Sequence, residues 1–176
     1  MTGKALNMGQ VCLSPDYCFV PAESLDSFIA EASRHFSEMF PRIIDNPDYT
    51  SVINARHYER LHGLMEDARQ KGADLRVINP AQEEFHQQPA GLHKIPMTFV
   101  VNPTEEMKVM QEEIFGPVLC IKTYQQINDC IQYINARPRP LGLYYFGDGA
   151  EEERLVLDKT ISGGACVNDV LGQASC

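Results

Sequence analysis

The stretch NMGQVCLSPDYCFVP, residues 7–21, joins a glycine-containing turn to a β-prone run. Within it, residues 16–20 (DYCFV) hold the aromatic and β-branched residues typical of a short strand, and Pro21 ends that strand. Gly9 permits backbone conformations that residues with a Cβ avoid. The order of turn, cysteine and strand therefore predicts that Cys12 lies at a backbone turn next to a sheet.

Strand and helix patterns alternate along the rest of the chain. Apolar residues at helical spacing predict helices over residues 25–39, 54–71, 127–134 and 150–160. Ser24 is placed to cap the first of these helices, and Gly72 is placed to end the second. Further strands are predicted over residues 74–78, 97–102, 119–124, 141–146 and 163–168. This alternation predicts a single α/β domain over residues 1–176, with a largely parallel or mixed sheet flanked by helices.

The composition is that of an ordinary globular protein, with 44% hydrophobic and 22% charged residues. The formal net charge is −9 and the lysines and arginines are scattered, which argues against a nucleic-acid partner. No apolar stretch approaches the ~20 residues that span a bilayer, and the N-terminal residues lack the apolar core of a signal peptide. We therefore expect no membrane partner and a cytoplasmic location.

The cysteines form no recognisable metal-binding or disulfide framework. No CxxC is present and no Cys/His pair has zinc-finger spacing, so we expect no metal site. In a cytoplasmic chain the default is reduced thiols, most of them buried. The question is therefore which thiol has a chemical role among Cys12, Cys18, Cys120, Cys130, Cys166 and Cys176.

Cys12 is the first candidate for a reactive group. A nucleophilic cysteine needs its sulfur presented at a turn, with donors nearby for the oxyanion that forms on attack. The backbone N–H of Cys12 is suited to that task. The alternative is a core cysteine, because Val11 and Leu13 flank it. Cys18 lies inside the predicted strand, which favours a packing role.

The segment QEEIFGP, residues 111–117, is the second candidate. Two adjacent acids run into Ile114, Phe115 and a Gly-Pro pair just before a predicted strand. One interpretation is a helix end with solvated acids, a buried Phe115 and a turn. The other is that a carboxylate accepts hydrogen bonds from the ribose hydroxyls of a dinucleotide.

These two motifs together resemble the aldehyde dehydrogenase superfamily. NMGQVC resembles the Asn-x-Gly-Gln-x-Cys element of that family, and the PDY that follows resembles its class 3 branch. EEIFGPV is one of the more specific strings of the family. Further strings follow in family order, namely NPDYTSVINARHYERL (46–61), QKGADL (70–75), NARPRPLGLYYFG (135–147) and ISGGACVNDV (161–170). The resemblance covers nearly the whole chain and points to the bacterial coniferyl aldehyde dehydrogenases.

The resemblance implies a fold and a chemistry. The fold is the three-layer catalytic domain of the family, and Cys12 is the nucleophile that adds to the aldehyde to give a thiohemiacetal and then a thioester. Glu113 would bind the nicotinamide ribose and Phe115 would pack beside the nicotinamide ring, whereas Glu112 has no such role. The substrate implied is a small-molecule aldehyde, aromatic like coniferyl aldehyde, and the cofactor is NAD or NADP.

The family also has a dinucleotide-binding domain before the cysteine and an oligomerising tail after the Asn-Asp-Val element. Residues 1–176 contain neither, so the resemblance implies that a domain outside this sequence binds most of the cofactor, and that the parent protein is a homo-oligomer. We expect the chain alone to be inactive, because the glutamate that activates water would also lie outside it. We expect it to self-associate through apolar surface that the other domain would cover.

Two alternatives stay open. A thiol hydrolase or acyltransferase would need a histidine bonded to Cys12, and none of the five histidines stands in a recognisable context for that role. A non-catalytic scaffold would keep the fold without a reactive Cys12. The aromatic run Tyr144, Tyr145 and Phe146 favours core packing over substrate contact, and Asn168 with Asp169 favours a turn near the site.

Overall fold

The computed structural model describes residues 1–172 of the chain. Its main sheet has four strands in the order β1-β4-β3-β2. The strands run parallel from β1 through β4 to β3, and β2 pairs antiparallel with β3. Their bounds are Tyr17–Pro21 for β1, Asp74–Val77 for β2, Thr98–Val101 for β3 and Val118–Tyr124 for β4. The predicted α/β fold with a mostly parallel sheet is therefore confirmed.

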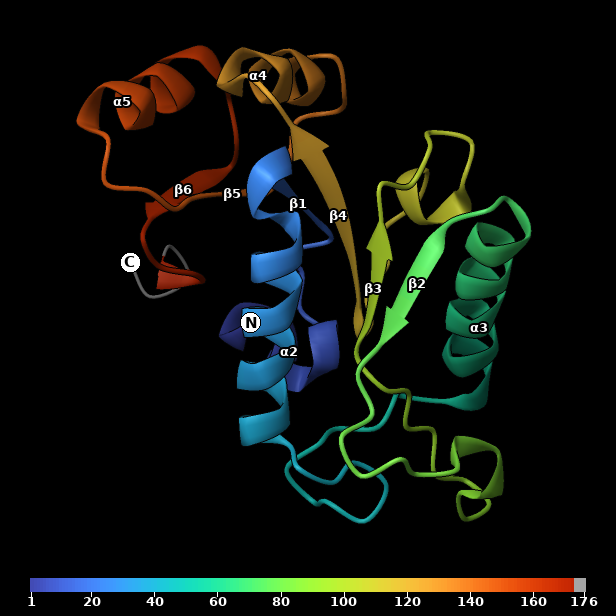
Figure 1. Ribbon diagram of the computed structural model, residues 1–176. Coiled ribbons are helices and arrows are strands. Elements are labelled where there is room, and N and C mark those ends of the chain that lie inside the picture. Colours follow the sequence, from blue (N-terminus) through green and yellow to red (C-terminus); the bar gives the residue numbers. More distant parts are fainter. Residues whose placement is uncertain (173–176) are drawn as a thin grey trace.

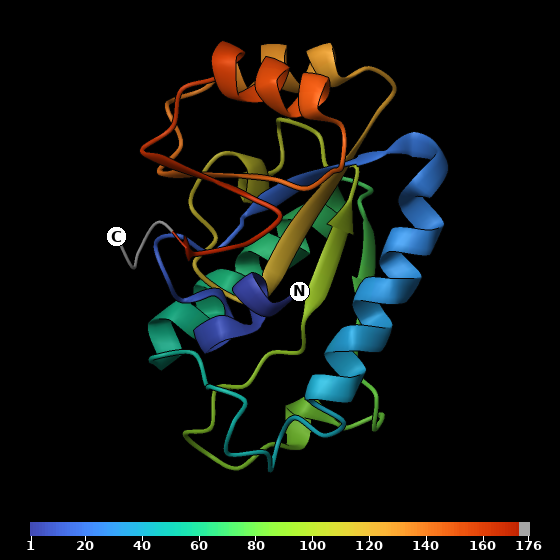
Figure 2. The ribbon, with the colours of Figure 1, turned by 90° about the vertical axis from the view of Figure 1, so that its left-hand side faces the viewer.

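Helices cover both faces of this sheet, as Figure 1 shows and Figure 2 repeats after a quarter turn. Helix α2 (Leu25–Met39) lies on one face and α3 (Ala55–Gln70) on the other. Because side chains alternate along a strand, Phe99 packs on the α2 side and its neighbour Val100 on the α3 side. Both central strands are thus buried on two faces, which gives the three layers that the resemblance implied.

The ends of these helices follow the sequence signals in part. The Asn54 side chain accepts a hydrogen bond of 3.0 Å from the His57 N–H, which caps α3, and Gly72 takes a left-handed φ of +85° just beyond its end. Ser24 precedes α2, but within the described chain its side chain makes no capping bond. Its carbonyl instead accepts a bond from the Ser27 hydroxyl, so the predicted side-chain cap is wrong.

A smaller unit lies beyond the end of β4 (Figure 1). Strands β5 (Gly142–Tyr145) and β6 (Gly164–Val167) pair in parallel, and helices α4 (Ile127–Asn135) and α5 (Ala150–Lys159) lie beside them. Its own core consists of Ile131, Leu143, Tyr145 and Val156. Strand β5 ends before Phe146, which is 62% exposed, so the prediction that this residue packs in the core is wrong.

Short helices complete the fold where the sequence shows no helical period. They are α1 (Thr2–Ala5) and the single 3-10 turns η1 (Leu6–Gly9), η2 (Ala22–Ser24), η3 (Phe85–Gln87) and η4 (Lys108–Met110). Turn η1 overlaps the start of the first motif singled out above, and η4 directly precedes the second. Among residues 1–172, no helix is long and apolar enough to cross a membrane.

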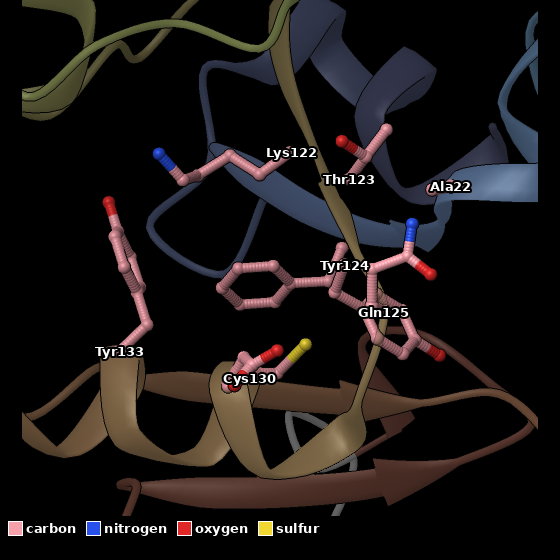
Figure 3. Close-up of a pocket in the computed structure, with 9 residues that line it drawn as sticks. Ala22, Lys122, Thr123, Tyr124, Gln125, Cys130 and Tyr133 are labelled. Atoms are coloured by element: carbon pink, nitrogen blue, oxygen red, sulfur yellow. The ribbon is translucent and has the colours of Figure 1, made fainter.

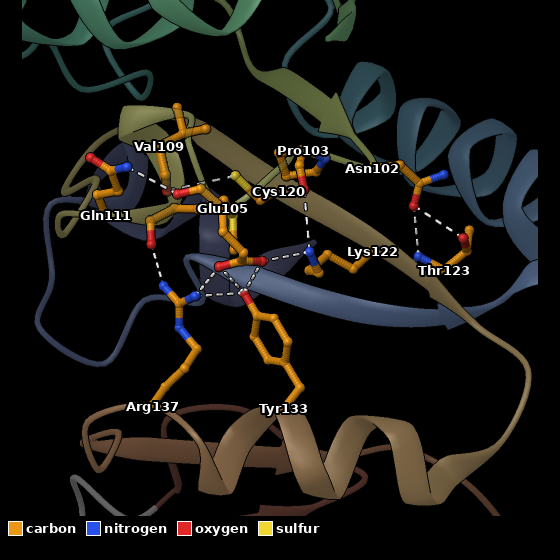
Figure 4. Close-up of polar contacts among 11 residues, drawn as sticks. Asn102, Pro103, Glu105, Val109, Gln111, Cys120, Lys122, Thr123, Tyr133 and Arg137 are labelled. Carbon is orange, nitrogen blue, oxygen red and sulfur yellow. Dashed lines mark hydrogen bonds and ion pairs between the residues drawn. The ribbon is translucent and has the colours of Figure 1, made fainter. Parts of the chain in front are cut away.

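A polar junction around Glu105 fixes α4 to the main sheet (Figure 4). The carboxylate of Glu105 accepts hydrogen bonds from Lys122 Nζ at 2.9 Å, from Tyr133 Oη at 2.8 Å and from the Arg137 guanidinium. The Lys122 ammonium lies 4.9 Å and the Arg137 guanidinium 5.0 Å from the centre of the Tyr133 ring, within cation–π range. This junction connects the smaller unit to the sheet that carries the motifs.

Candidate active site

The loop before Cys12 has an unusual backbone. Asn7, Met8 and Gly9 have positive φ values of 48°, 50° and 75°, a conformation that costs a residue with a Cβ on the order of 1–3 kcal/mol. Burial of Met8, 1% exposed, and side-chain bonds of Gln10 hold the loop in this form. Strain of this kind gathers at functional sites, and here it directly precedes the candidate nucleophile.

Cys12 itself lies at the surface in a turn that Ser14 closes by donating its N–H to the Val11 carbonyl at 2.8 Å. The sulfur is exposed, so a small electrophile can reach it. The turn is neither helix nor strand, which agrees with the predicted presentation of this thiol. Among residues 1–172, the backbone N–H of Cys12 donates no hydrogen bond within the protein, which leaves it open to a bound oxygen atom.

The two motifs, far apart in sequence, meet at a pair of glycines. A Cβ on Gly9 would lie 2.8 Å from the carbonyl carbon of Gly116 and would overlap its oxygen. A Cβ on Gly116 would lie 2.5 Å from a methyl carbon of Leu61 on α3. Only residues without side chains allow this approach, so the loop of Cys12 and the loop of Glu113 and Phe115 form one structure.

Asp16 ties the same two loops together electrostatically. One carboxylate oxygen accepts the Ile114 N–H at 3.0 Å, and the other lies 3.4 Å from the ammonium of Lys4, which is 2% exposed. Burial lowers the pKa of Lys4 below its usual value, and the neighbouring Asp16 charge opposes that shift. Sequence reasoning missed both residues, although a lysine and an aspartate flanking an apolar turn are a detectable signal.

Arg60 of α3 binds the loop that carries Glu113 and Phe115. Its guanidinium donates to the carbonyl oxygen of Glu113 at 3.1 Å and to that of Ile114, and it lies 3.6 Å from the Glu112 carboxylate. Glu112 is therefore an exposed partner of Arg60 in an ion pair. Sequence reasoning missed Arg60, because nothing in the spacing connects that helix with this loop.

The side chains of Glu113 and Phe115 are differently placed. Glu113 is exposed, and among residues 1–172 its carboxylate forms no ion pair, so its oxygens are available to hydroxyl donors. Phe115 is half-buried and has a left-handed φ of 49°, so its backbone, like that of the Cys12 loop, is strained. The interpretation in which Phe115 is a buried residue is thus only partly correct, because this side chain is half-buried.

The other candidates make contacts of a structural kind. Cys18 is in β1 and packs against the α2-side core, where burial raises the pKa of its thiol to about 12. Asn168 exchanges two hydrogen bonds with the backbone of Gly147, which fits the turn expected there. Cys176 lies outside the described residues.

Two arrangements of side chains were not found among residues 1–172. Across residues 1–172 no histidine hydrogen-bonds to Cys12, the arrangement that a thiol hydrolase would need. In the same range no group of histidine, cysteine, aspartate and glutamate side chains is arranged to hold a metal ion. The exposed thiol and the adjoining acidic loop are therefore the chemical features to explain.

An open pocket of about 290 Å³ lies elsewhere, between the end of β4 and α4 (Figure 3). Lys122, Tyr124, Cys130 and Tyr133 line it, and these side chains come from the two elements that face one another. Burial raises the pKa of the Cys130 thiol to about 11. Neither Cys12 nor Glu113 borders this pocket, so it belongs to the junction and not to the candidate active site.

The combination of a strained turn with an exposed cysteine and a Glu-x-Phe loop packed on it agrees with the family comparison. A sequence model of the aldehyde dehydrogenase family matches residues 1–175. The chain therefore belongs to the aldehyde dehydrogenase family.

Among members of this family, coniferyl aldehyde dehydrogenases are similar in sequence to the chain over nearly its whole length. The chain is 52% identical over 171 residues to a probable coniferyl aldehyde dehydrogenase of Caulobacter vibrioides, and 51% identical to the coniferyl aldehyde dehydrogenase of a Pseudomonas species. These alignments cover 97% of the chain and 35% of each relative. The chain thus spans about a third of the length of the curated relatives it matches, and its resemblance to this branch is confirmed.

Solved structures agree on the fold. A substrate-bound AldH of Staphylococcus aureus superimposes with a TM-score of 0.85 at 31% identity, over 99% of the chain and 36% of that structure. An indole-3-acetaldehyde dehydrogenase of P. syringae, solved with NAD+, superimposes with a TM-score of 0.82 at 22% identity, over 97% of the chain and 34% of that structure. The second likeness supports the fold alone.

Proposed function

We propose that this chain is the cysteine-bearing catalytic part of an enzyme that oxidises an aldehyde to a carboxylic acid with NAD or NADP. The observation that carries the proposal is the contact of the two motif loops at Gly9 and Gly116, which places an exposed thiol on the same structure as Glu113 and Phe115. The similarity to coniferyl aldehyde dehydrogenases supports an aromatic aldehyde such as coniferyl aldehyde as the substrate.

Cys12 begins the reaction. Its thiolate sulfur attacks the carbonyl carbon, a C–S bond forms, and the oxygen gains negative charge next to the open N–H of Cys12. NAD or NADP, which Glu113 and Phe115 would hold at its ribose and nicotinamide ring, would supply the acceptor for the hydride that leaves this carbon. Attack of water on the resulting thioester then releases the carboxylic acid and returns the thiol of Cys12. Because the buried thiols hold their protons up to high pH, Cys18 and Cys120 are unsuited to this role.

Glu113 and Phe115 fit the cofactor's ribose and ring. The Glu113 carboxylate is exposed and its backbone is fixed by Arg60, so it can accept hydrogen bonds from ribose hydroxyls without first losing a partner. The half-buried Phe115 offers an aromatic face at the surface of the same loop. The rest of the cofactor site, the base that activates water and the oligomerising contacts belong to sequence outside residues 1–176 in this proposal.

The test is selective labelling of the folded chain. With limiting iodoacetamide, we expect Cys12 to be alkylated before the other thiols, and coniferyl aldehyde to slow that alkylation by forming a reversible thiohemiacetal. Peptide mass spectrometry locates the label, and Cys166, which is partly exposed, is the internal control. Labelling of Cys12 no faster than Cys166, and insensitive to aldehyde, would contradict the assignment of the nucleophile.

Two measurements test how the proposed function is divided between this chain and the part of its relatives that it does not cover. We expect the chain alone to show no steady turnover of coniferyl aldehyde with NAD or NADP, because the proposal assigns the water-activating base to that other part. If the chain alone turned over aldehyde at a normal rate, and Cys12→Ser abolished that turnover, the base that activates water would have to lie within residues 1–176. Exposed apolar residues such as Ile53, Phe146 and Ile161 also lead us to expect self-association, and a strict monomer by light scattering at high concentration would count against it.

A further inference from the structure

The peptide unit that follows Leu13 is bound on both of its edges. Its N–H, that of Ser14, donates to the Val11 carbonyl at 2.8 Å. Its carbonyl, that of Leu13, accepts a hydrogen bond of 2.8 Å from the hydroxyl of Tyr144. A peptide plane held on two sides cannot rotate, so this unit fixes the turn in which Cys12 lies.

Tyr144 reaches this turn from a distant part of the chain. It lies on β5, in the smaller unit, and its side chain is half-buried. Two residues before Cys12, the Gln10 side chain donates to the Ser51 carbonyl at 3.0 Å and accepts the Ile53 N–H at 2.9 Å. The loop is therefore held between β5 and the segment before α3, with Cys12 exposed between the two anchors.

We propose that Tyr144 is a positioning residue for Cys12, whose hydroxyl, by binding the Leu13 carbonyl, aims the Cys12 N–H at the oxygen of an attacked carbonyl group. The inference rests on the proposed function, in which Cys12 is the nucleophile. The N–H that stabilises an oxyanion acts well only when it is held in place before the reaction, because a donor that must reorganise loses part of its effect. The turn has no helix or strand of its own to provide that rigidity, and the bond from β5 provides it.

The neighbouring residue supplies a matched control. Tyr145 points to the other side of β5, where its hydroxyl donates to the Glu152 carboxylate of α5 at 3.0 Å, and it is buried in the core of the smaller unit. Tyr144→Phe and Tyr145→Phe each remove one hydroxyl oxygen from the same strand, the first with its bond to Leu13 and the second with its bond to Glu152. Only the first removes a bond to the turn of Cys12.

Two reactions of the Cys12 thiolate distinguish the loss of a positioned N–H from a general loss of thiol reactivity. Acylation by p-nitrophenyl acetate forms the S–C bond through a tetrahedral oxyanion and expels p-nitrophenolate, whereas alkylation by iodoacetamide displaces iodide without an oxyanion. Since both reactions start from the Cys12 thiolate, the ratio of their rates cancels any change in its ionisation, and it should be independent of pH. We expect Tyr144→Phe to lower the acylation-to-alkylation ratio about three- to tenfold, a part of the effect of losing one oxyanion donor.

Tyr145→Phe should leave that ratio at the wild-type value, and Cys120, which is fully buried, should stay unlabelled in every variant that is folded. An unchanged ratio in Tyr144→Phe, or an equal fall in both variants, would overturn the positioning role. A wild-type chain in which p-nitrophenyl acetate does not acylate Cys12 preferentially would instead count against the proposed function. The two failures are thus distinguishable.

Discussion

Cys12 and Cys18 belong to one short stretch of chain, yet they lie in regions built on different principles. The loop of Cys12 is held by polar contacts and by glycines, and its backbone is strained. Strand β1 of Cys18 is held by a ladder to β4 and by apolar packing, and the adjoining Cys120 is fully buried. The difference teaches that the exposure of a thiol here follows from the scaffold around it and not from the local sequence, which is apolar on both sides of each cysteine.

The largest loss of stability is expected for Gly9→Ala, which disrupts the loop of Cys12 and leaves strand β1 unchanged. The added Cβ would overlap the Gly116 carbonyl and would also require an alanine at a φ of +75°, so we expect a loss of about 3 kcal/mol in the free energy of unfolding. Urea denaturation measures that loss. The alkylation rate of Cys12 should change with it, since the two motif loops must separate.

Gly72→Ala is the control for this substitution. Gly72 has a similar φ of +85°, but a Cβ there would meet no atom within 4 Å. We expect a loss of about 1 kcal/mol from the backbone conformation alone, with no change at Cys12. Equal losses in the two variants would show that the close approach of the loops contributes nothing to stability.

A smaller effect is expected where Asp16 connects the loop to the start of the strand. Asp16→Asn keeps an acceptor for the Ile114 N–H but removes the charge that faces the buried Lys4 ammonium. We expect a loss of about 2 kcal/mol at neutral pH, less than for a fully enclosed pair because the Asp16 side chain is 29% exposed.

The double variant Lys4→Met with Asp16→Asn sharpens this prediction. Without a buried charge to compensate, much of the stability should return, and a double-mutant cycle from denaturation midpoints measures the coupling. Strict additivity of the two single losses would mean that the 3.4 Å contact carries no energy of its own.

Local patterns in the sequence predicted the elements of this comparison but not its contacts. The strand over residues 16–20 and the helix over 54–71 follow from periods of two and of 3.6 residues, which a short stretch contains in full. Cys12, Glu113 and Phe115 came from the family resemblance, and their roles stay predictions. The residues that hold them, Arg60 and Tyr144, act across distances in sequence that no local pattern encodes.

The residues with a strained, left-handed backbone could not be predicted from the sequence either. Met8 and Phe115 have side chains that disfavour a left-handed backbone, and only tertiary contacts such as the burial of Met8 impose it. The contact of Tyr144 could not be predicted from sequence either, because alternating aromatic residues on a strand favour a core position. Its hydroxyl instead binds the turn of Cys12, and only the three-dimensional structure shows which of two neighbouring tyrosines does so.

The last of the three effects concerns the sheet side of the comparison and develops only at alkaline pH. Burial raises the pKa of Cys120 from 9.0 to about 12, so between these values the unfolded chain releases a proton that the folded chain keeps. The stability from this thiol is therefore fully present below about pH 9 and is lost as pH rises toward 12, with a slope of at most about 1.4 kcal/mol per pH unit.

Unfolding free energies measured across that alkaline range should fall less steeply in Cys120→Ala than in the wild type, because the variant has no buried thiol at this position to titrate. The difference in slope is informative even though the substitution also leaves a cavity, since the cost of a cavity does not depend on pH. Cys12→Ala removes an exposed thiol and is the matched control. If Cys120→Ala and the wild type lose stability in parallel, the Cys120 thiol is not held protonated by the sheet, and the contrast between loop and strand would rest on geometry alone.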